Sequence, residues 1–229
     1  MRNILTGVVC AVALSLVATA AKAQSAPGEA LRLEVESLRV TGRLELTGVD
    51  VASSRLLTEF YEQRRFEPAW TQPQKAEELL ELIIASDADG LNPADYHQAA
   101  VARSIAALNG ERLLPPAERA EFDILLTDAL VRLAYHQRYG KINPYTLDPQ
   151  WNFNRGLDAT DPVSAIQAAI DAPSLQGHME NVIPRGLFYR EMRDALARYR
   201  NIVAAGGWPS VPQGATLRPG AADPRVAII

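Results

Sequence analysis

The sequence predicts a mainly α-helical protein of about six helices, with a short strand pair near its N-terminus. From Val51 onward, apolar residues recur at spacings of three and four, which is the period of one helix face. Cap residues and prolines precede these segments and glycines follow them, as they do at helix starts and stops. No internal repeat of fixed period stands out, so a single helical domain is expected.

Residues 1–23 have the organisation of a secretory signal peptide. Arg2 supplies a positive start, residues 4–21 form an apolar run, and residues 21–23 (Ala-Lys-Ala) form a cleavage site before Gln24. An uncleaved membrane anchor is the alternative, because about 18 apolar residues is near the lower limit for spanning a bilayer. We therefore expect export to the periplasm, with membrane contact only if the signal peptide stays attached.

The only cysteine, Cys10, lies inside this apolar run and lacks the preceding pattern of a lipoprotein site. Cleavage would remove it, leaving no thiol nucleophile, disulfide or thiolate metal ligand. The same cleavage removes Arg2 and Lys22 and no acid, which moves the net charge from −4 to −6. This mild acidity argues against nucleic acid or anionic membrane surfaces as partners.

Residues 24–49 show little helical periodicity. Alternation at residues 38–40 and 44–46, with Gly42 and Gly48 near the turns, predicts the short strand pair.

Three helices are predicted in the first half of the chain. The first begins near Val51 and ends before Pro68, and its apolar face consists of Val51, Leu56, Leu57, Phe60 and Tyr61. The second spans residues 75–86, with Ala76, Leu79, Leu80, Ile83 and Ile84 on one face. The third begins at Asn92, has Pro93 at its first helical position, and runs to about residue 108.

Three further helices are predicted in the second half. The longest spans residues 116–139 and is ended by Gly140. Another begins at Asp161-Pro162 and runs to residue 171. The last runs from about 185 to 205, with the apolar stripe Phe188, Met192, Leu196, Tyr199, Ile202 and Val203.

Metal and histidine chemistry have little support in the sequence. Residues 87–90 (Asp-Ala-Asp-Gly) resemble part of a calcium loop, but Ala85 and Tyr96 would occupy its first and last ligand positions. A helix stop at Gly90 is the preferred interpretation. His97, His136 and His178 are far apart in the chain and show no paired spacing, so each is expected to be a surface or partly buried helix residue. No metal or cofactor is predicted.

Two sugar-related alternatives remain open. Glu59, Glu62, Glu77, Glu78 and Glu81 recur at helical spacing. A pair of them could serve a glycosidase, although a solvated helix face is preferred. The segment after the longest helix contains Tyr145, Trp151, Phe153 and Arg155, which could contact a glycan, although packing against that helix is preferred.

Three ordered stretches carry a resemblance to a known family. Residues 60–70 run from Phe-Tyr-Glu-Gln-Arg-Arg-Phe to Pro-Ala-Trp, and residues 89–97 read Asp-Gly-Leu-Asn-Pro-Ala-Asp-Tyr-His. The third stretch runs from Leu126-Thr127-Asp128-Ala129 to residues 140–144, Gly-Lys-Ile-Asn-Pro. In this order behind a signal peptide, they resemble the scaffold region of large bacterial murein L,D-transpeptidases. Residues 197–200 and 206–209, followed by the 214–229 tail, resemble that family's junction into its peptidoglycan-binding repeat.

The resemblance implies a non-catalytic part of a cell-wall enzyme. In this family of acyltransferases, a cysteine in a Ser-His-Gly-Cys motif attacks a tetrapeptide stem and forms an acyl-enzyme. The sequence contains no copy of that motif, so no catalytic residue is predicted and the chain is expected to be inactive alone. Expected partners are peptidoglycan or cell-wall enzymes. A stand-alone peptidoglycan-binding or partner-docking module is the alternative.

The resemblance also implies how the chain divides, with a signal peptide at 1–23 and an N-terminal extension at 24–44. The helical scaffold domain is expected at 45–207. A linker and the incomplete start of a peptidoglycan-binding repeat are expected at 208–229, where Asp223 and Pro224 cap a short helix. The chain is thus expected to be truncated before the catalytic domain.

Overall fold

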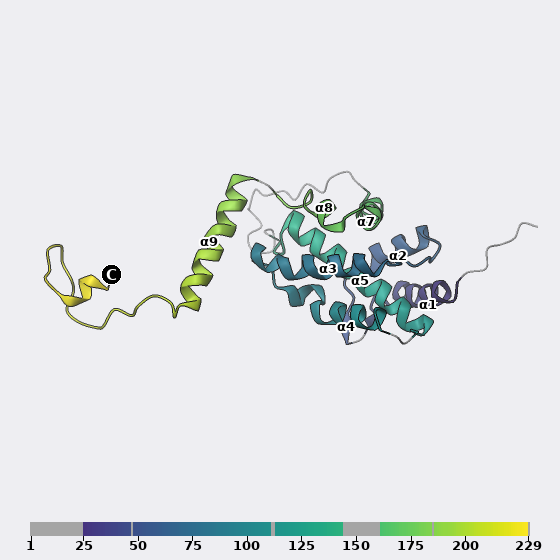
Figure 1. Ribbon diagram of the computed structural model, residues 1–229, viewed down its shortest axis with the longest axis horizontal. Coiled ribbons are helices and arrows are strands. Elements are labelled where there is room, and N and C mark those ends of the chain that lie inside the picture. The colour runs from purple at the N-terminus through teal and green to yellow at the C-terminus, as the bar shows by residue number, and fades with distance from the viewer. Residues whose placement is uncertain (1–24, 47, 111–112, 144–160, 185, 229) are drawn as a thin grey trace, which may run out of the picture.

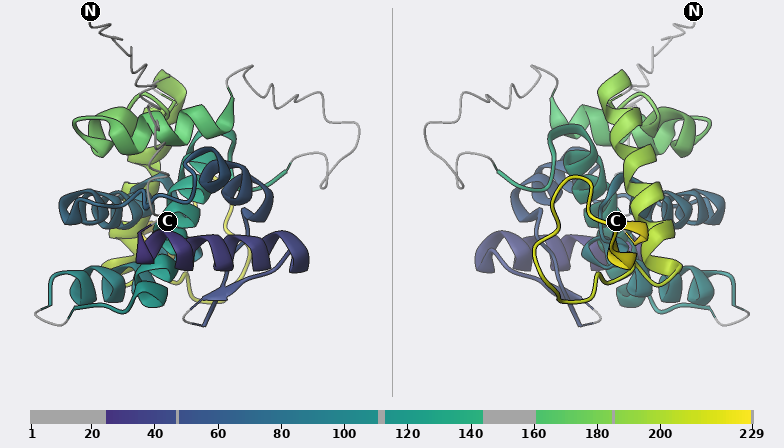
Figure 2. Two further views of the ribbon diagram at one scale, coloured as in Figure 1. Left: turned by 90° about the vertical axis from the view of Figure 1, so that its right-hand side faces the viewer. Right: turned by 90° about the vertical axis from the view of Figure 1, so that its left-hand side faces the viewer.

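The computed structural model describes residues 25–46, 48–110, 113–143, 161–184 and 186–228, and the predicted signal peptide at 1–23 lies outside them. The described chain is mainly helical, as predicted (Figure 1). The longest helix, α5 (Pro116–Tyr139), runs through the middle of a helical bundle (Figures 1 and 2). Among the described elements, its main helix contacts are with α1 (Ala26–Thr41), α2 (Ser54–Gln63), α3 (Pro73–Ala85) and α4 (Gln98–Leu108).

Helix α1 replaces the non-periodic segment predicted at 24–49. The side chain of Ser25 caps its first turn by accepting a hydrogen bond from the Gly28 amide, 3.2 Å away. Leu31, Val35 and Leu38 lie at helical spacing and are buried, because α1 packs on α5 and α2. The prediction of low periodicity is therefore wrong for this segment.

A two-stranded antiparallel hairpin connects α1 to α2. Its strands are β1 (Glu45–Leu46) and β2 (Val49–Asp50), with Leu46 opposite Val49. The strand predicted at 38–40 is wrong, since those residues form the end of α1. Gly42 then ends the helix at a φ of 67°, a left-handed conformation that glycine adopts easily.

The remaining predicted helices agree well with the structure. Besides α3 and α5, these are α7 (Pro162–Asp171) and α9 (Leu187–Ala204). Each of α3, α5 and α7 begins at a proline, which the first helical position tolerates because its N–H would have no helical partner. The short elements are η1 (Ser86–Asp89), η2 (Pro93–Tyr96), α8 (Leu175–Met179) and η3 (Pro224–Ala227).

The predicted helix at 92–108 is interrupted. The side chain of Asn92 caps η2 as expected, but His97 has a φ of 59° and separates η2 from α4. Left-handed backbone is uncommon for residues other than glycine, so tertiary contacts must hold His97 in place.

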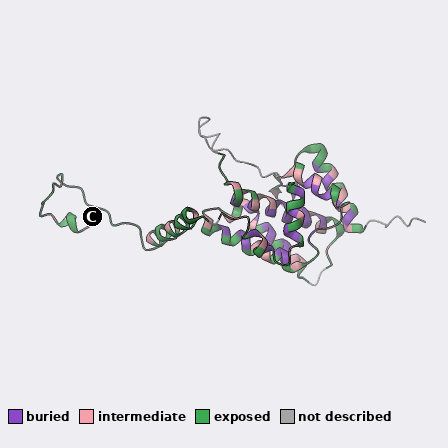
Figure 3. Cartoon of the chain, turned by 90° about the horizontal axis from the view of Figure 1, so that it is seen from above, coloured by how far each residue is buried: buried purple, intermediate pink, exposed green. Residues whose placement is uncertain are grey.

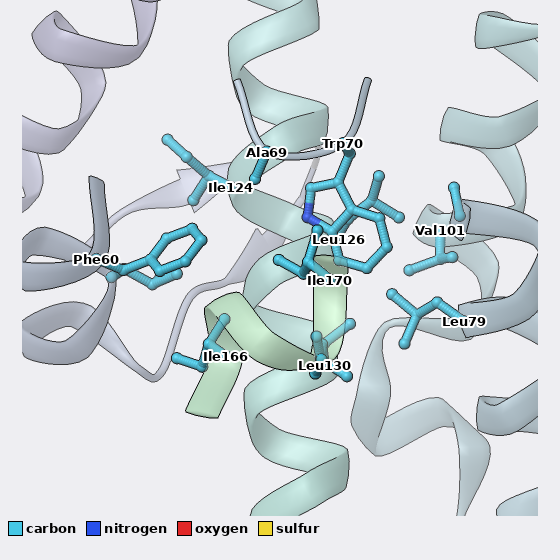
Figure 4. Close-up of a cluster of buried hydrophobic side chains, with 14 of the residues drawn as sticks. Phe60, Ala69, Trp70, Leu79, Val101, Ile124, Leu126, Leu130, Ile166 and Ile170 are labelled. Carbon is cyan, nitrogen blue, oxygen red and sulfur yellow. The ribbon is translucent and has the colours of Figure 1, made fainter. Parts of the chain in front are cut away.

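The core surrounds α5 on several sides. Phe122, Ile124, Leu125 and Leu126 are all buried although they are nearly consecutive, which happens only when neighbours enclose a helix. Figure 4 shows Trp70 in this core, near side chains of α5, α3 and α7. Figure 3 colours the chain by burial, and the buried positions are concentrated in the bundle.

Helix α9 lies at the edge of the bundle and has no buried residue. It contacts the bundle mainly at η1. Among the described residues, no helix combines the length and apolar character that crossing a membrane requires.

Candidate functional site on the central helix

A buried carboxylate, Asp123 of α5, organises the first stretch that carries the family resemblance. It accepts hydrogen bonds from the Tyr61 hydroxyl at 2.8 Å, from the Ala69 amide at 2.9 Å, and from the Trp70 amide at 3.0 Å. The indole N–H of Trp70 donates to Oγ1 of Thr127, 2.9 Å away. These bonds attach α2 and the segment after it to one face of α5.

The chain reaches this position through a tight reversal after α2. Arg65 and Phe66 both have positive φ, at 54° and 59°. Such conformations cost roughly 1 kcal/mol or more each for residues other than glycine. The reversal brings the Ala69 and Trp70 amides to Asp123, so buried hydrogen bonds offset its cost.

Burial dominates the electrostatics of this cluster. It raises the pKa of Asp123 above its ordinary range, and the amides of Ala69 and Trp70 offset only part of the shift. Burial and the neighbouring Asp123 carboxyl raise the pKa of Tyr61 well above its usual value. A tyrosine whose pKa is raised stays protonated at neutral pH and is a poor proton donor in catalysis, so this cluster is suited to holding structure.

A second buried carboxylate, Asp128, organises the second stretch. Its Oδ1 accepts from the Ser53 amide at 2.9 Å, and its Oδ2 lies 2.7 Å from Nε2 of His97. Nη1 of Arg132 lies 3.8 Å from Oδ2. Burial alone would raise the pKa of Asp128, but the hydrogen bonds from His97 and Ser53 outweigh it and lower that pKa. The pairing with Asp128 is a buried tertiary contact that fixes the position of the His97 side chain next to its left-handed backbone.

The end of α5 binds the rest of the second stretch. The Tyr96 hydroxyl lies 3.1 Å from Nδ1 of His136, and burial raises the pKa of Tyr96 to about 12. Lys141, just beyond α5, forms an ion pair with Asp95 at 2.6 Å. The third resemblance stretch begins on α5 and continues past its end, and side chains of the first two stretches bond to residues of α5 or just beyond it. All three stretches therefore meet at α5.

A charged groove of about 480 Å³ opens beside His97, between the β1–β2 hairpin and the start of α4. Asp50, Asp95, Arg103 and Arg132 line it. Charges of both signs can hydrogen-bond a polar ligand, but the described lining residues include no hydroxyl or thiol nucleophile. A second groove of about 390 Å³ lies between α5, α7 and α8 and is mostly apolar.

The structure gives the predicted candidates mainly structural roles. Asp87 and Asp89 of the rejected calcium loop pair with Arg200 and Arg193, at 2.8 and 3.0 Å. Within the described ranges, no group of three or more His, Cys, Asp or Glu side chains could hold a metal ion. The expectation that His97 is a surface or partly buried residue is wrong, because its side chain is almost fully buried against Asp128.

The helical glutamates also contact neighbouring protein groups. Glu78 accepts a hydrogen bond from the Leu175 amide at the start of α8, and Glu77 accepts one from Asn109 at 2.8 Å. Glu59 pairs with Arg55 at 2.9 Å on the same helix. The possible glycan contacts Tyr145, Trp151, Phe153 and Arg155 lie outside the described residues.

Sequence reasoning did not identify Asp123 and Asp128 as central residues. The available signal was two aspartates among the mainly apolar residues from Phe122 to Leu133.

One protein-family model, described as Scaffold domain, matches residues 55–196, which is more than half of the chain. The chain belongs to the scaffold-domain family. No curated protein and no solved structure gives a significant match. The match to the scaffold domain begins in α2 and ends within α9, so it contains Asp123, Asp128 and all their described partners except Ser53. Helix α1 lies outside the matched residues, yet it packs on α5 as part of the same core.

Proposed function

We propose that this scaffold domain is the non-catalytic part of an exported L,D-transpeptidase-like protein of peptidoglycan cross-linking and cell-wall remodelling. Two sequence observations support the finer assignment. The ordered stretches between residues 60 and 144 resemble the scaffold region of those enzymes, and residues 1–23 have the features of a periplasmic signal peptide.

One structural observation carries the non-catalytic part of the proposal. The main buried polar side chains of the resemblance stretches bond to one another and to the backbone. Tyr61 and Trp70 bond to Asp123 and Thr127, and His97 bonds to Asp128. Groups that are buried and paired in this way hold helices together, because leaving one unpaired would cost stability. The scaffold would then provide a rigid body beside a catalytic module.

A transpeptidation assay tests the absence of catalysis. The purified protein is incubated with disaccharide-tetrapeptide, and 3→3 cross-linked product is sought by mass spectrometry. We expect no product above a no-protein control, since the sequence has no Ser-His-Gly-Cys motif. Cross-linked product would overturn the non-catalytic assignment.

The family assignment has a separate test in the coding sequence that follows the Ile229 codon. A continuing frame that encodes a Ser-His-Gly-Cys motif is expected. If the nucleotides after the Ile229 codon encode only an unrelated protein, the link to L,D-transpeptidases would be contradicted.

Sedimentation with isolated sacculi distinguishes the scaffold proposal from the alternative, a module that binds peptidoglycan through residues 145–155. For a scaffold we expect weak retention that Trp151→Ala does not change. Strong retention that Trp151→Ala abolishes would favour glycan contact by Tyr145, Trp151, Phe153 and Arg155 instead.

A further inference from the structure

Helix α9 carries an apolar face that the described chain leaves uncovered. Phe188, Met192, Tyr199 and Val203 share one side of the helix and are 76, 55, 58 and 69% exposed. Trp208 lies beside Tyr199, with 5.7 Å between ring centroids, and extends this face. Figure 3 shows α9 outside the bundle. A contiguous exposed apolar surface of this kind is typical of an interaction site.

The bundle holds α9 by a different edge. Arg193 pairs with Asp89, and Arg200 bonds to both carboxylate oxygens of Asp87, at 2.8 and 3.0 Å. Arg193 and Arg200 are seven residues apart, which is two helical turns, so they mark one edge. The apolar face therefore stays open while α9 is attached to η1.

We propose that this face pairs with the same face of a second copy of the chain, in an antiparallel two-helix contact. The apolar residues are arranged symmetrically along α9. Phe188 and Val203 are equidistant from a point between Ala195 and Leu196, and so are Met192 and Tyr199. A two-fold axis near that point brings each apolar side chain opposite another, and a self-complementary surface is what such an axis requires.

The charges on the free edge of α9 select the same arrangement. Glu191 and Arg198 are also two turns apart, on the edge away from η1, and neither has an ion pair within the described residues. Their midpoint falls between Asp194 and Ala195, about 1.5 Å along the helix from the apolar midpoint. An antiparallel pair therefore places Glu191 of each copy near Arg198 of the other, forming two ion pairs.

A parallel pair lacks this complementarity. It would set the free edge of one copy against the η1 edge of the other, so Glu191 would not face Arg198. The small side chain of Ala195 lies close to the centre of the antiparallel contact, where it permits a close approach of the two helices.

Sedimentation velocity on the full purified chain, over a wide range of protein concentrations, tests the proposal. We expect a monomer–dimer equilibrium. Glu191→Arg or Arg198→Glu alone should weaken association about tenfold, since each change turns two attractive contacts into repulsive ones. The double variant, and an equimolar mixture of the two single variants, should restore association.

Arg190→Glu is the matched control, because residue 190 points away from the proposed contact and should leave association unchanged. Met192→Asp should abolish association while circular dichroism stays that of the parent chain. A protein that remains monomeric at all concentrations would overturn the proposal. The proposal would also be overturned if neither charge reversal changed the strength of association, or if the mixture of the two single variants failed to restore it.

Discussion

Asp123 and Asp128 show how two carboxylates five residues apart on α5 are stabilised differently. Asp123 receives neutral donors, and burial keeps its pKa raised. Burial would raise the pKa of Asp128, but hydrogen bonds from His97 and Ser53 outweigh it, so that pKa is lowered. The same residue type therefore contributes to stability with opposite dependence on pH.

Asp123→Ala should destabilise the fold by about 3 kcal/mol or more, because the Tyr61 hydroxyl and the amides of Ala69 and Trp70 would lose their buried acceptor. Urea unfolding followed by tryptophan fluorescence measures the change. Asp194→Ala, at an exposed position of α9, is the control and should change stability little. Equal stability of the two variants would contradict the role given to Asp123.

Asp128 should stabilise the fold in a way that acid removes. Because its folded pKa is lowered, this contribution is present above the ordinary value of 3.8 and is lost as the pH falls through the lower folded value. Asp123 acts oppositely, since its raised folded pKa means that stability falls as the pH rises through that value.

The free energy of unfolding of the parent and of Asp128→Asn, measured from neutral pH down to about 3, isolates the Asp128 contribution. The difference between them should shrink below the ordinary pKa of 3.8. A difference that stays constant across this range would show that ionised Asp128 is not stabilised by its neighbours.

At the scale of the elements, strong periodicity and clear caps predicted the structure well, as at Pro116–Tyr139 and Pro162–Asp171. Helix α1 was missed because exposed Leu33 and Val40 lie among its buried positions and blur the pattern. The break at His97 could not be predicted, since it depends on Asp128, 31 residues away. Helix α8 has five residues, which is too short for a periodic signal.

The attachment of α9 to η1 should depend on its two arginines. Replacing both Arg193 and Arg200 with alanine removes the ion pairs to Asp89 and Asp87. We expect faster proteolysis between α8 and α9, with no change in the melting temperature of the bundle. Arg190→Ala is the control, and it should leave the cleavage rate unchanged. An unchanged rate in the double variant would mean that other contacts hold α9.

At the scale of the molecule, the sequence predicted a mainly helical fold and a scaffold region, and both agree with the structure and the family match. It did not predict that the resemblance stretches meet around Asp123 and Asp128, because such contacts join segments far apart in the chain. The amphipathic pattern of α9 also could not show what covers its apolar side. Such a pattern identifies which face of a helix is apolar, but not what packs against that face.

The enclosure of α5 has a consequence for how the molecule opens. Residues 122–130 are all buried by neighbouring helices, so we expect solvent deuterium to reach their amides only when the whole bundle comes apart. Those of α9 can exchange by local fraying. Hydrogen exchange followed by mass spectrometry should therefore separate the two helices by orders of magnitude in rate, and the slow class around Asp123 would report the global free energy of unfolding.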